Sequence, residues 1–268
     1  MTNYHSYEWI MARLQEHYNE ALNYFPEDRI VGIFLQGSQN YGLEYEDSDV
    51  DSKLIVVPSF EEIAMNRSPV STTHIRTNDE HIDFKDIRLY MQTFRKQNLN
   101  FLEILFTPYY IINPRYYCYW NKLVEAREDI AHYDNVQALK SMRGIAMEKY
   151  HALERRYPSR IPWIEKFGYD PKQLHHLLRI EEFLEKYLDG IPYEKCLFSE
   201  DPGYLVDVKR GVIPYDYAIP LADKAKEHID KMYTEYMEQV DSFHNSSIDD
   251  LLDDVQLNIM REAIKSEL

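Results

Sequence analysis

The sequence predicts an α+β protein, in which a small mixed β-sheet with flanking helices is followed by a mostly helical C-terminal domain. Short apolar runs rich in β-branched residues, typical of buried strands, lie within the first 112 residues. From residue 113 onward, apolar residues recur every three to four positions, which is typical of amphipathic helices. Hydrophobic residues make up 44% of the chain and aromatic residues 14%, which is ample for a packed core.

The first helix and the first strand lie close to the N-terminus. Apolar residues recur every four positions from Ile10 to Leu22, which predicts a helix over 7–23. Pro26 ends this pattern. The run Ile30–Leu35 is apolar and rich in β-branched residues, so it is interpreted as a buried strand.

Two more strands and two helices complete the N-terminal region. A second strand is predicted over 51–57, and Pro58 ends it. Residues 80–85 alternate between polar and apolar side chains, as a third strand would. The spacing of apolar residues then predicts a helix over 87–94 and another that begins in 100–106.

The change from a mixed to an all-helical pattern near residue 113 is the predicted domain boundary. The 268 residues suit one large or two modest domains. The predicted domains are therefore 1–112 and 113–268. Helices of the second domain are expected over 119–131, 134–156, 172–188, 219–243 and 248–266.

The composition argues against several classes of protein. No apolar run approaches the ~18–20 residues that a membrane span needs. The N-terminus lacks the basic-then-apolar order of a secretory signal. The two cysteines, Cys118 and Cys196, are too few for a disulfide framework or a four-ligand zinc site. We therefore expect a reducing, cytoplasmic setting and no membrane partner.

The chain is strongly acidic, with a formal net charge of −16. This charge disfavours a general coat for nucleic acid, which needs many phosphate-neutralising cations. A local basic groove remains compatible, because electric fields follow patches as well as net charge. Residues 140–160 hold such a local excess, with six basic residues against two acidic ones: Lys140, Arg143, Lys149, Arg155, Arg156 and Arg160 against Glu148 and Glu154.

The polar segment 37–48 connects the first two strands and carries a possible phosphate site. Gly37 lets the backbone approach a phosphate closely. Ser38 can donate its hydroxyl, and the amides that follow can form an anion nest or a helix start. The sequence therefore predicts a phosphate cradle at the end of the first strand.

Carboxylates stand where the second and third strands are expected. Asp49 and Asp51 point to the same side, because side chains alternate along a strand. Such a pair suits a hard divalent cation, since Mg²⁺ binds one or two carboxylates together with substrate phosphates. Asp83 is the best candidate for a third carboxylate. Asp86 is a rival, but it stands at the start of the next helix, where an acid commonly caps.

Three carboxylates would allow metal-ion catalysis with Mg²⁺ or Mn²⁺. Asp49, Asp51 and Asp83 could hold two metals about 3.5–4 Å apart, one activating the attacking oxygen and the other holding a triphosphate. In such a site Asp83 could also take the proton of the incoming hydroxyl.

A basic helix face is predicted in the second domain. Within the expected helix 172–188, Lys172, His175, His176 and Arg179 occupy positions i, i+3, i+4 and i+7 and share one face. Such a face suits a triphosphate or an acceptor phosphate. Lys172 and Arg179 therefore join Gly37 and Ser38 as predicted nucleotide-binding residues.

The order Gly37-Ser38, about ten residues, Asp49-x-Asp51 and then Asp83 resembles the polymerase β-type nucleotidyltransferase superfamily. The resemblance implies a small mixed sheet and transfer of a nucleoside monophosphate from an NTP, with ATP the expected donor and pyrophosphate the leaving group. All three carboxylate positions of the pattern are present.

A closer similarity extends over several segments of the chain. The segments Ser48–Asp51, Ile82–Lys85, Asn100–Leu105 and Gly168–Arg179 are similar to a bacterial and phage branch of predicted nucleotidyltransferases that is associated with RNA repair. The similarity implies an RNA end as the acceptor. A protein hydroxyl and a small molecule remain alternative acceptors, and a nucleotide-sensing or partner-binding module is the non-catalytic alternative. The oligomeric state is left open.

Overall fold

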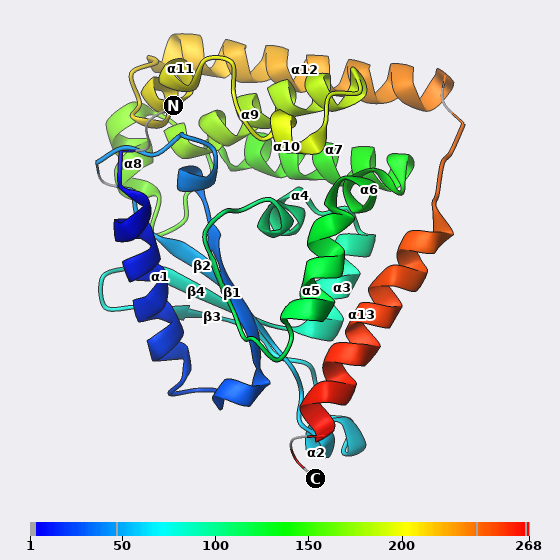
Figure 1. Ribbon diagram of the computed structural model, residues 1–268. Helices are drawn as coiled ribbons and strands as arrows, with labels where there is room; N and C mark the ends of the chain where they lie inside the picture. Colours follow the sequence, from blue (N-terminus) through cyan, green and yellow to red (C-terminus); the bar gives the residue numbers. More distant parts are fainter. Residues whose placement is uncertain (1–3, 47, 240, 266, 268) are drawn as a thin grey trace. The chain divides into compact units, whose positions relative to one another are not determined.

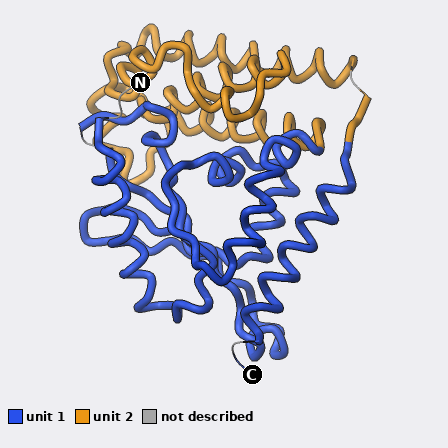
Figure 2. The backbone as a smooth tube through the Cα atoms, viewed as in Figure 1, with its two compact units in different colours: residues 1–133, 244–268 blue, residues 134–243 orange. Residues whose placement is uncertain are grey.

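The computed structural model has the predicted α+β class, with a mixed sheet and a helical C-terminal region (Figure 1). It divides into two compact units, which Figure 2 colours separately. Unit 1 comprises residues 1–133 and 244–268, and unit 2 comprises residues 134–243. The residues that the structure describes are 4–46, 48–239, 241–265 and 267.

Three helices that follow residue 112 belong to unit 1: α5 (Tyr117–Glu125), α6 (Arg127–His132) and α13 (Ser246–Lys265). Helix α13 packs against α5 and against α3 (Ile87–Arg95). The division between the units therefore differs from the boundary that the sequence predicts at residue 113. The reason is tertiary: the last helix of the chain returns to pack on the first unit.

Unit 1 contains one five-stranded sheet with the order β3-β4-β2-β1-β5. β1 runs antiparallel to β2 and β5, β3 runs antiparallel to β4, and β2 and β4 are parallel. The three strands that the sequence predicts are confirmed as β1, β2 and β4. The bounds are β1 (Ile30–Gln36), β2 (Asp51–Val56), β3 (Ser71–Ile75), β4 (His81–Asp86) and β5 (Tyr110–Ile112).

The two edge strands, β3 and β5, are absent from the sequence prediction. β3 reads Ser-Thr-Thr-His-Ile and is mostly exposed, so it lacks the apolar alternation of a half-buried strand. β5 has only three residues. The short helix α2 (Phe60–Ala64), which precedes β3, is also absent from that prediction, although Ser59 and Glu62 form a capping box at its start.

Helix α1 (Tyr7–Ala21) covers one face of the sheet (Figure 1). Ile10, Leu14 and Tyr18 are buried, as the sequence predicts, whereas Leu22 caps the helix and is exposed. Each fully buried aliphatic side chain contributes about 1.5–3 kcal/mol. This core combines α1 with strand residues that point to the same face, among them Ile10, Leu14, Ile33, Leu35, Leu54, Val56, Ile82 and Phe84.

The opposite face of the sheet carries Phe34, Lys53 and Asp83, which are paired in register on β1, β2 and β4. The ring of Phe34 packs against Trp120 of α5, with centroids 4.8 Å apart. Helix α3 contacts both β2 and β4. The short helices α4 (Leu99–Leu102) and η3 (Glu103–Leu105) follow α3 and contribute Phe101, which lies over this face. The remaining short elements of unit 1 are η1 (Glu27–Arg29) and η2 (Ser38–Asn40).

Unit 2 is helical and is built around α9 (Pro171–Leu188), which contacts α7, α10, α11 and α12. The turn before α9 requires Gly168, whose φ is +83° and whose added Cβ would lie 2.8 Å from the Tyr215 ring. None of the described helices combines the length and the apolar composition of a membrane span. The other helices are α7 (Asn135–Ala152), α8 (Ile161–Phe167), α10 (Tyr193–Cys196), α11 (Pro202–Lys209) and α12 (Tyr215–Gln239).

Candidate active site

One edge of the sheet brings together the predicted phosphate turn and the predicted acid pair. Gln36 at the end of β1 pairs in register with Asp51 at the start of β2. Gly37 therefore turns away from the sheet beside Asp51, with a φ of +117° that favours glycine. The turn continues into η2, where the carbonyl of Ser38 accepts hydrogen bonds from the amides of Tyr41 and Leu43. Of the two forms that the sequence allows for the amides after Ser38, the structure shows the helix start.

The two members of the predicted acid pair have different surroundings. Asp51 is partly buried, and its Oδ1 accepts a 2.9 Å hydrogen bond from the backbone amide of His81 on β4. Asp49 lies before the strand and is exposed. The side-chain amide of Gln39 in η2 donates to the carbonyl oxygen of Asp49 at 2.6 Å. A hydrogen bond thus joins the predicted phosphate cradle directly to the segment that carries the two acids.

Asp83 lies on the same face of the sheet as Asp51, one strand away. It pairs in register with Lys53 rather than with Asp51, and its Oδ1 accepts a 3.1 Å hydrogen bond from the hydroxyl of Thr73. Its rival, Asp86, is a helix cap as predicted, because it accepts from the amide and the guanidinium of Arg88 at the start of α3. Asp83 is therefore the β4 acid that faces the candidate site.

Lys53 is buried among these acids and is absent from the sequence prediction. Its ammonium donates to the carbonyl of Asn100, lies 3.8 Å from Glu103 Oε1 and 4.4 Å from the centre of the Phe101 ring. Burial lowers the pKa of Lys53 to about 7, although the charges of Asp83 and Asp51 act to raise it. A lysine within the apolar run of the second strand is the signal that could have identified this residue.

Glu80, just before β4, is a second residue that the sequence prediction misses. It is buried, and its carboxylate accepts hydrogen bonds from Arg13 at 2.5 Å and from the backbone amide of Val50 at 3.3 Å. The ring of His17 lies 3.0 Å from the same carboxylate and 2.8 Å from the Ser52 hydroxyl. Burial raises the pKa of Glu80, but the hydrogen bonds from His17 and Arg13 outweigh it and hold the pKa well below its usual range. Glu80 thereby fixes the segment between Asp49 and Ser52.

The acids at this edge match the donor chemistry of a magnesium ion. In the described part of the chain, no group of three or more His, Cys, Asp or Glu side chains is arranged to hold a metal. Asp49, Asp51 and Asp83 are nevertheless hard oxygen donors, and Mg²⁺ needs only one or two protein carboxylates when substrate phosphates supply further ligands. The donor set fits an ion that binds together with a nucleotide.

The predicted basic face lies on α9 of unit 2, and the structure divides it. Lys172, His176 and Arg179 are partly exposed, whereas His175 is buried and its Nδ1 lies 2.8 Å from the carbonyl of Leu205. Burial lowers the pKa of His175 to about 3, so its ring is neutral at pH 7. His175 therefore lies on the predicted face of the helix, but it is buried and neutral, so it packs α9 against α11 and adds no charge to that face.

The basic residues of the segment 140–160 also differ in their surroundings. Arg143 is held by Asp230 at 2.7 Å, and Arg156 by Glu165 at 3.1 Å. Three other cations of the segment, Lys149, Arg155 and Arg160, line one cavity of about 190 Å³. The sequence thus predicts the excess of positive charge, and the fold determines which of these cations line the same cavity.

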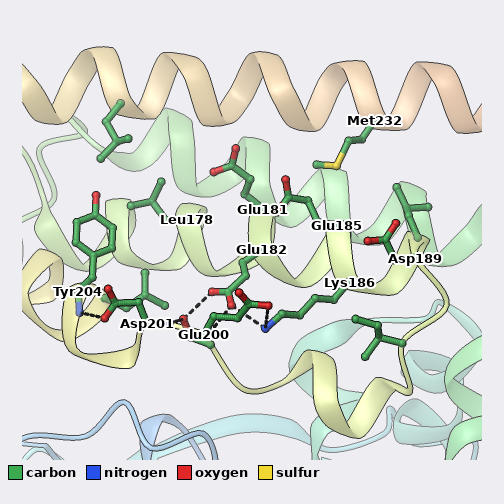
Figure 3. A pocket seen from close by; sticks show the side chains of 15 residues that line it. Leu178, Glu181, Glu182, Glu185, Lys186, Asp189, Glu200, Asp201, Tyr204 and Met232 are labelled. Atoms are coloured by element: carbon green, nitrogen blue, oxygen red, sulfur yellow. Dashed lines mark hydrogen bonds and ion pairs between the residues drawn. The ribbon is translucent and has the colours of Figure 1, made fainter.

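A second, larger cavity of about 840 Å³ in unit 2 is strongly acidic (Figure 3). Glu182 lines this cavity, and its carboxylate accepts hydrogen bonds from Lys186 at 2.7 Å and from Ser199 at 2.6 Å. Apolar side chains such as Leu178 and Met232 line the walls. The acidic lining residues are Glu181, Glu182, Glu185, Asp189, Glu200 and Asp201.

The chain is distantly similar to a solved structure of a known protein. No protein-family model matches the chain, and no curated protein matches it. Among solved structures, a nucleotidyltransferase-like protein from Exiguobacterium sibiricum is similar, with 11% identity over 84% of this chain and 75% of that chain, at a TM-score of 0.28. At this TM-score the similarity carries no weight for function.

Proposed function

We propose that the protein is a metal-dependent nucleotidyltransferase, which transfers a nucleoside monophosphate from an NTP to an acceptor hydroxyl. The observation that carries the proposal is the junction of β1, β2 and β4 at one sheet edge. There Gly37 opens a tight turn beside Asp51, and Asp83 faces the same side from the adjacent strand. A backbone turn for phosphate beside paired carboxylates suits phosphoryl transfer, in which positioning and electrostatic stabilisation do most of the work.

The chemistry is a displacement at the α-phosphorus of the NTP. The acceptor oxygen forms a bond to this phosphorus as the bond to the bridging oxygen of the β-phosphate breaks, and pyrophosphate leaves with the electron pair. The proton of the acceptor hydroxyl passes to the carboxylate of Asp83 and then to solvent. Gly37 and Ser38 hold phosphate oxygens through the backbone and the hydroxyl. Glu80 keeps the Asp51 segment in place through its hydrogen bond to the Val50 amide.

A divalent ion would be held by Asp51 with Asp49 or Asp83 and by phosphate oxygens of the substrate. When bound, Mg²⁺ or Mn²⁺ lowers the charge on the phosphates and favours the ionised acceptor oxygen. The side chains meet the other requirement of the reaction, which is to hold the ion and the substrate in fixed positions. Lys53 lies beside Asp83 and Asp51 and partly balances their charge.

We propose an RNA end as the acceptor, because three cations of unit 2 converge on one cavity. A second candidate is a small cationic acceptor, such as an amino sugar, and the acidic cavity of unit 2 favours it. That cavity offers carboxylates for ammonium groups and apolar walls for a ring. ATP is the expected nucleotide donor for either acceptor.

Transfer of label from α-³²P-NTPs tests this function. Each NTP, with Mg²⁺ or Mn²⁺, is offered total RNA, protein extract, a panel of amino sugars or no acceptor. We expect label in RNA, and a fall of about 10³-fold in Asp51→Asn, since a metal ligand supplies several kcal/mol of transition-state stabilisation. Glu61→Gln is the matched control, because Glu61 is a 72% exposed acid of the same unit.

Three outcomes separate the candidates. Label in an amino sugar would replace RNA by the second acceptor, and label in protein would indicate nucleotidylation of a protein hydroxyl. Undiminished transfer by Asp51→Asn would overturn the assignment of the site. No label and no pyrophosphate from the wild-type chain under any condition would overturn the proposed reaction in favour of a nucleotide-sensing or partner-binding module.

A further inference from the structure

The small cavity of unit 2 has a positive lining that comes from two segments of the chain. Lys149 belongs to α7, and Arg155 and Arg160 follow it in the connection to α8. Two carboxylates also line the cavity, but each is already engaged. Glu148 pairs with its neighbour Lys149 at 2.9 Å. Asp170 caps α9 through a 3.0 Å hydrogen bond from the amide of Lys172, and its Oδ2 also lies 3.5 Å from Nε of Arg160.

Arg155 is the least neutralised of the three cations. Its guanidinium lies 4.7 Å from the centre of the Tyr157 ring, and no carboxylate among the described residues pairs with it. Further positive charge lies nearby on α9. Lys172, Arg179 and Lys149 all act to lower the pKa of His176, which is lowered first of all by burial. The cavity lining itself keeps an excess of positive charge, with three cations against two carboxylates, within an acidic chain.

Aromatic surface adjoins this cavity. Tyr157 lines it and is 44% exposed. Trp163 follows Arg160 by three residues, is 38% exposed and stacks on Phe167 with ring centroids 5.8 Å apart. A phosphate site beside an exposed aromatic ring is the pattern by which proteins bind single-stranded nucleic acid, with cations on the backbone and rings under the bases.

We propose that the basic pocket, formed by Lys149, Arg155, Tyr157, Ser159 and Arg160, binds a phosphate of a single-stranded polynucleotide, with the adjacent base stacked on Tyr157. The volume of about 190 Å³ suits one phosphate with a few waters. An acidic peptide would satisfy the cations but would bring no base to the exposed part of the Tyr157 ring, which Arg155 already contacts. The proposal rests on the proposed function in one respect: it identifies the acceptor as a polynucleotide.

Binding is measured with the full chain and fluorescently labelled RNA and DNA strands of about 12 nucleotides, within the range that single-strand sites cover. Anisotropy is recorded between about 50 and 200 mM salt. We expect Arg155→Glu to weaken binding about tenfold and to reduce the slope of log affinity against log salt by about 0.7, as for one lost phosphate contact. We expect Tyr157→Ala to weaken binding about fivefold or more and Tyr157→Phe to leave it unchanged.

Arg156→Glu is the matched control. Arg156 is the next residue along the chain, its charge changes by the same amount, and its side chain is 59% exposed and paired with Glu165. We expect it to weaken binding less than twofold. Equal losses in Arg155→Glu and Arg156→Glu would overturn the pocket, since only net charge would then matter. Equal competition by polyglutamate, or no binding by the wild-type chain at low salt, would overturn it as well.

A failure of the pocket can be distinguished from a failure of the proposed function. Asp51→Asn should bind the strands as the wild-type chain does, because Asp51 lies outside the pocket. Strand binding without nucleotidyl transfer would leave the pocket standing and overturn the reaction. Transfer of label to RNA that is unaffected by Arg155→Glu and Tyr157→Ala would leave the reaction standing and overturn the pocket.

Discussion

The two units of this protein arrange their charged side chains in opposite ways. In unit 1, opposite charges lie next to one another and are buried together. The Lys53 ammonium lies among carboxylates, and the Glu80 carboxylate lies between arginines and a histidine. In unit 2, charges separate along one helix. The first half of α9 is basic, with Lys172 and Arg179. The second half is mostly acidic, with Glu181, Glu182 and Glu185 against Lys186.

The two arrangements suit different tasks: that of unit 1 suits the positioning of side chains, and that of unit 2 suits the recognition of ligands. Buried alternating charges hold each other in place, and they are expensive to disturb because removal of one partner leaves the other desolvated. Segregated charges near the surface contribute little to stability but create a field that reaches into solvent. On this basis the first unit holds its proposed site residues rigidly, and the ligand recognition proposed for the second unit depends on charge.

The largest expected effect on stability is the loss of Lys53. In Lys53→Met a side chain of similar length removes the ammonium that lies 3.8 Å from the Glu103 carboxylate, which is 4% exposed. We expect the free energy of unfolding to fall by about 3 kcal/mol, as for other buried pairs that lose one partner. Urea unfolding at pH 6, where the ammonium is charged, measures this loss.

Lys85→Met is the control for Lys53→Met. The Lys85 ammonium lies 4.7 Å from the same Phe101 ring, on the other strand of the pair, but Lys85 is only partly buried. We expect a change within about 0.5 kcal/mol. Equal losses in the two variants would show that contact with Phe101, rather than a buried charge, determines the stability of this face.

The fold and the site could be predicted from the sequence to different degrees. β1 and β2 were within reach because each contains a continuous buried apolar run, and α1 and α13 because each has a periodic buried stripe. The exposed strand β3 has neither. Gly37, Asp51 and Asp83 could be proposed from spacing, since two strands and a turn bring them to one edge. Glu80 could not, because its partner His17 is 63 residues away and only the packed structure makes this acid central.

Replacement of Glu80 tests whether one buried acid holds the Asp51 segment. Glu80→Gln keeps the shape but removes the charge that faces Arg13, Arg76 and His17. We expect a loss of about 2 kcal/mol, because hydrogen bonds to a charged group contribute about 1.5–3 kcal/mol. Chemical denaturation of both variants, Glu80→Gln and Glu16→Gln, gives the comparison.

Glu16 is the matched acid on the surface. Its Oε2 lies 2.5 Å from Arg13 and 3.5 Å from Arg76, so it shares both arginines, but its side chain is 49% exposed against 6% for Glu80. We expect Glu16→Gln to cost less than about 1 kcal/mol. A larger loss from Glu16→Gln than from Glu80→Gln would contradict the view that burial gives the network its strength.

The smallest effect is expected in unit 2, from the buried ring of His175. Its folded pKa of about 3 lies below that of the unfolded chain, because burial and the nearby cations Lys209, Arg179 and Lys172 disfavour the charged ring. Below about pH 6.5 the unfolded chain takes up a proton that the folded chain does not accept until about pH 3. The free energy of unfolding therefore falls as the pH drops through this window, by about 1 kcal/mol between pH 7 and 5.5 from this group.

His175→Asn isolates that contribution. Asparagine can keep the hydrogen bond to the Leu205 carbonyl, which lies 2.8 Å from Nδ1, but has no group that titrates in this window. The variant should be less stable at pH 7, since a smaller side chain leaves a cavity, yet should lose less stability than the wild-type chain on going to pH 5.5. Parallel pH curves for the two proteins would mean that the ring takes up its proton in the folded state as readily as in the unfolded one. Unit 2 would then tolerate charge in its interior as unit 1 does, and the contrast between the units would be confined to their surfaces.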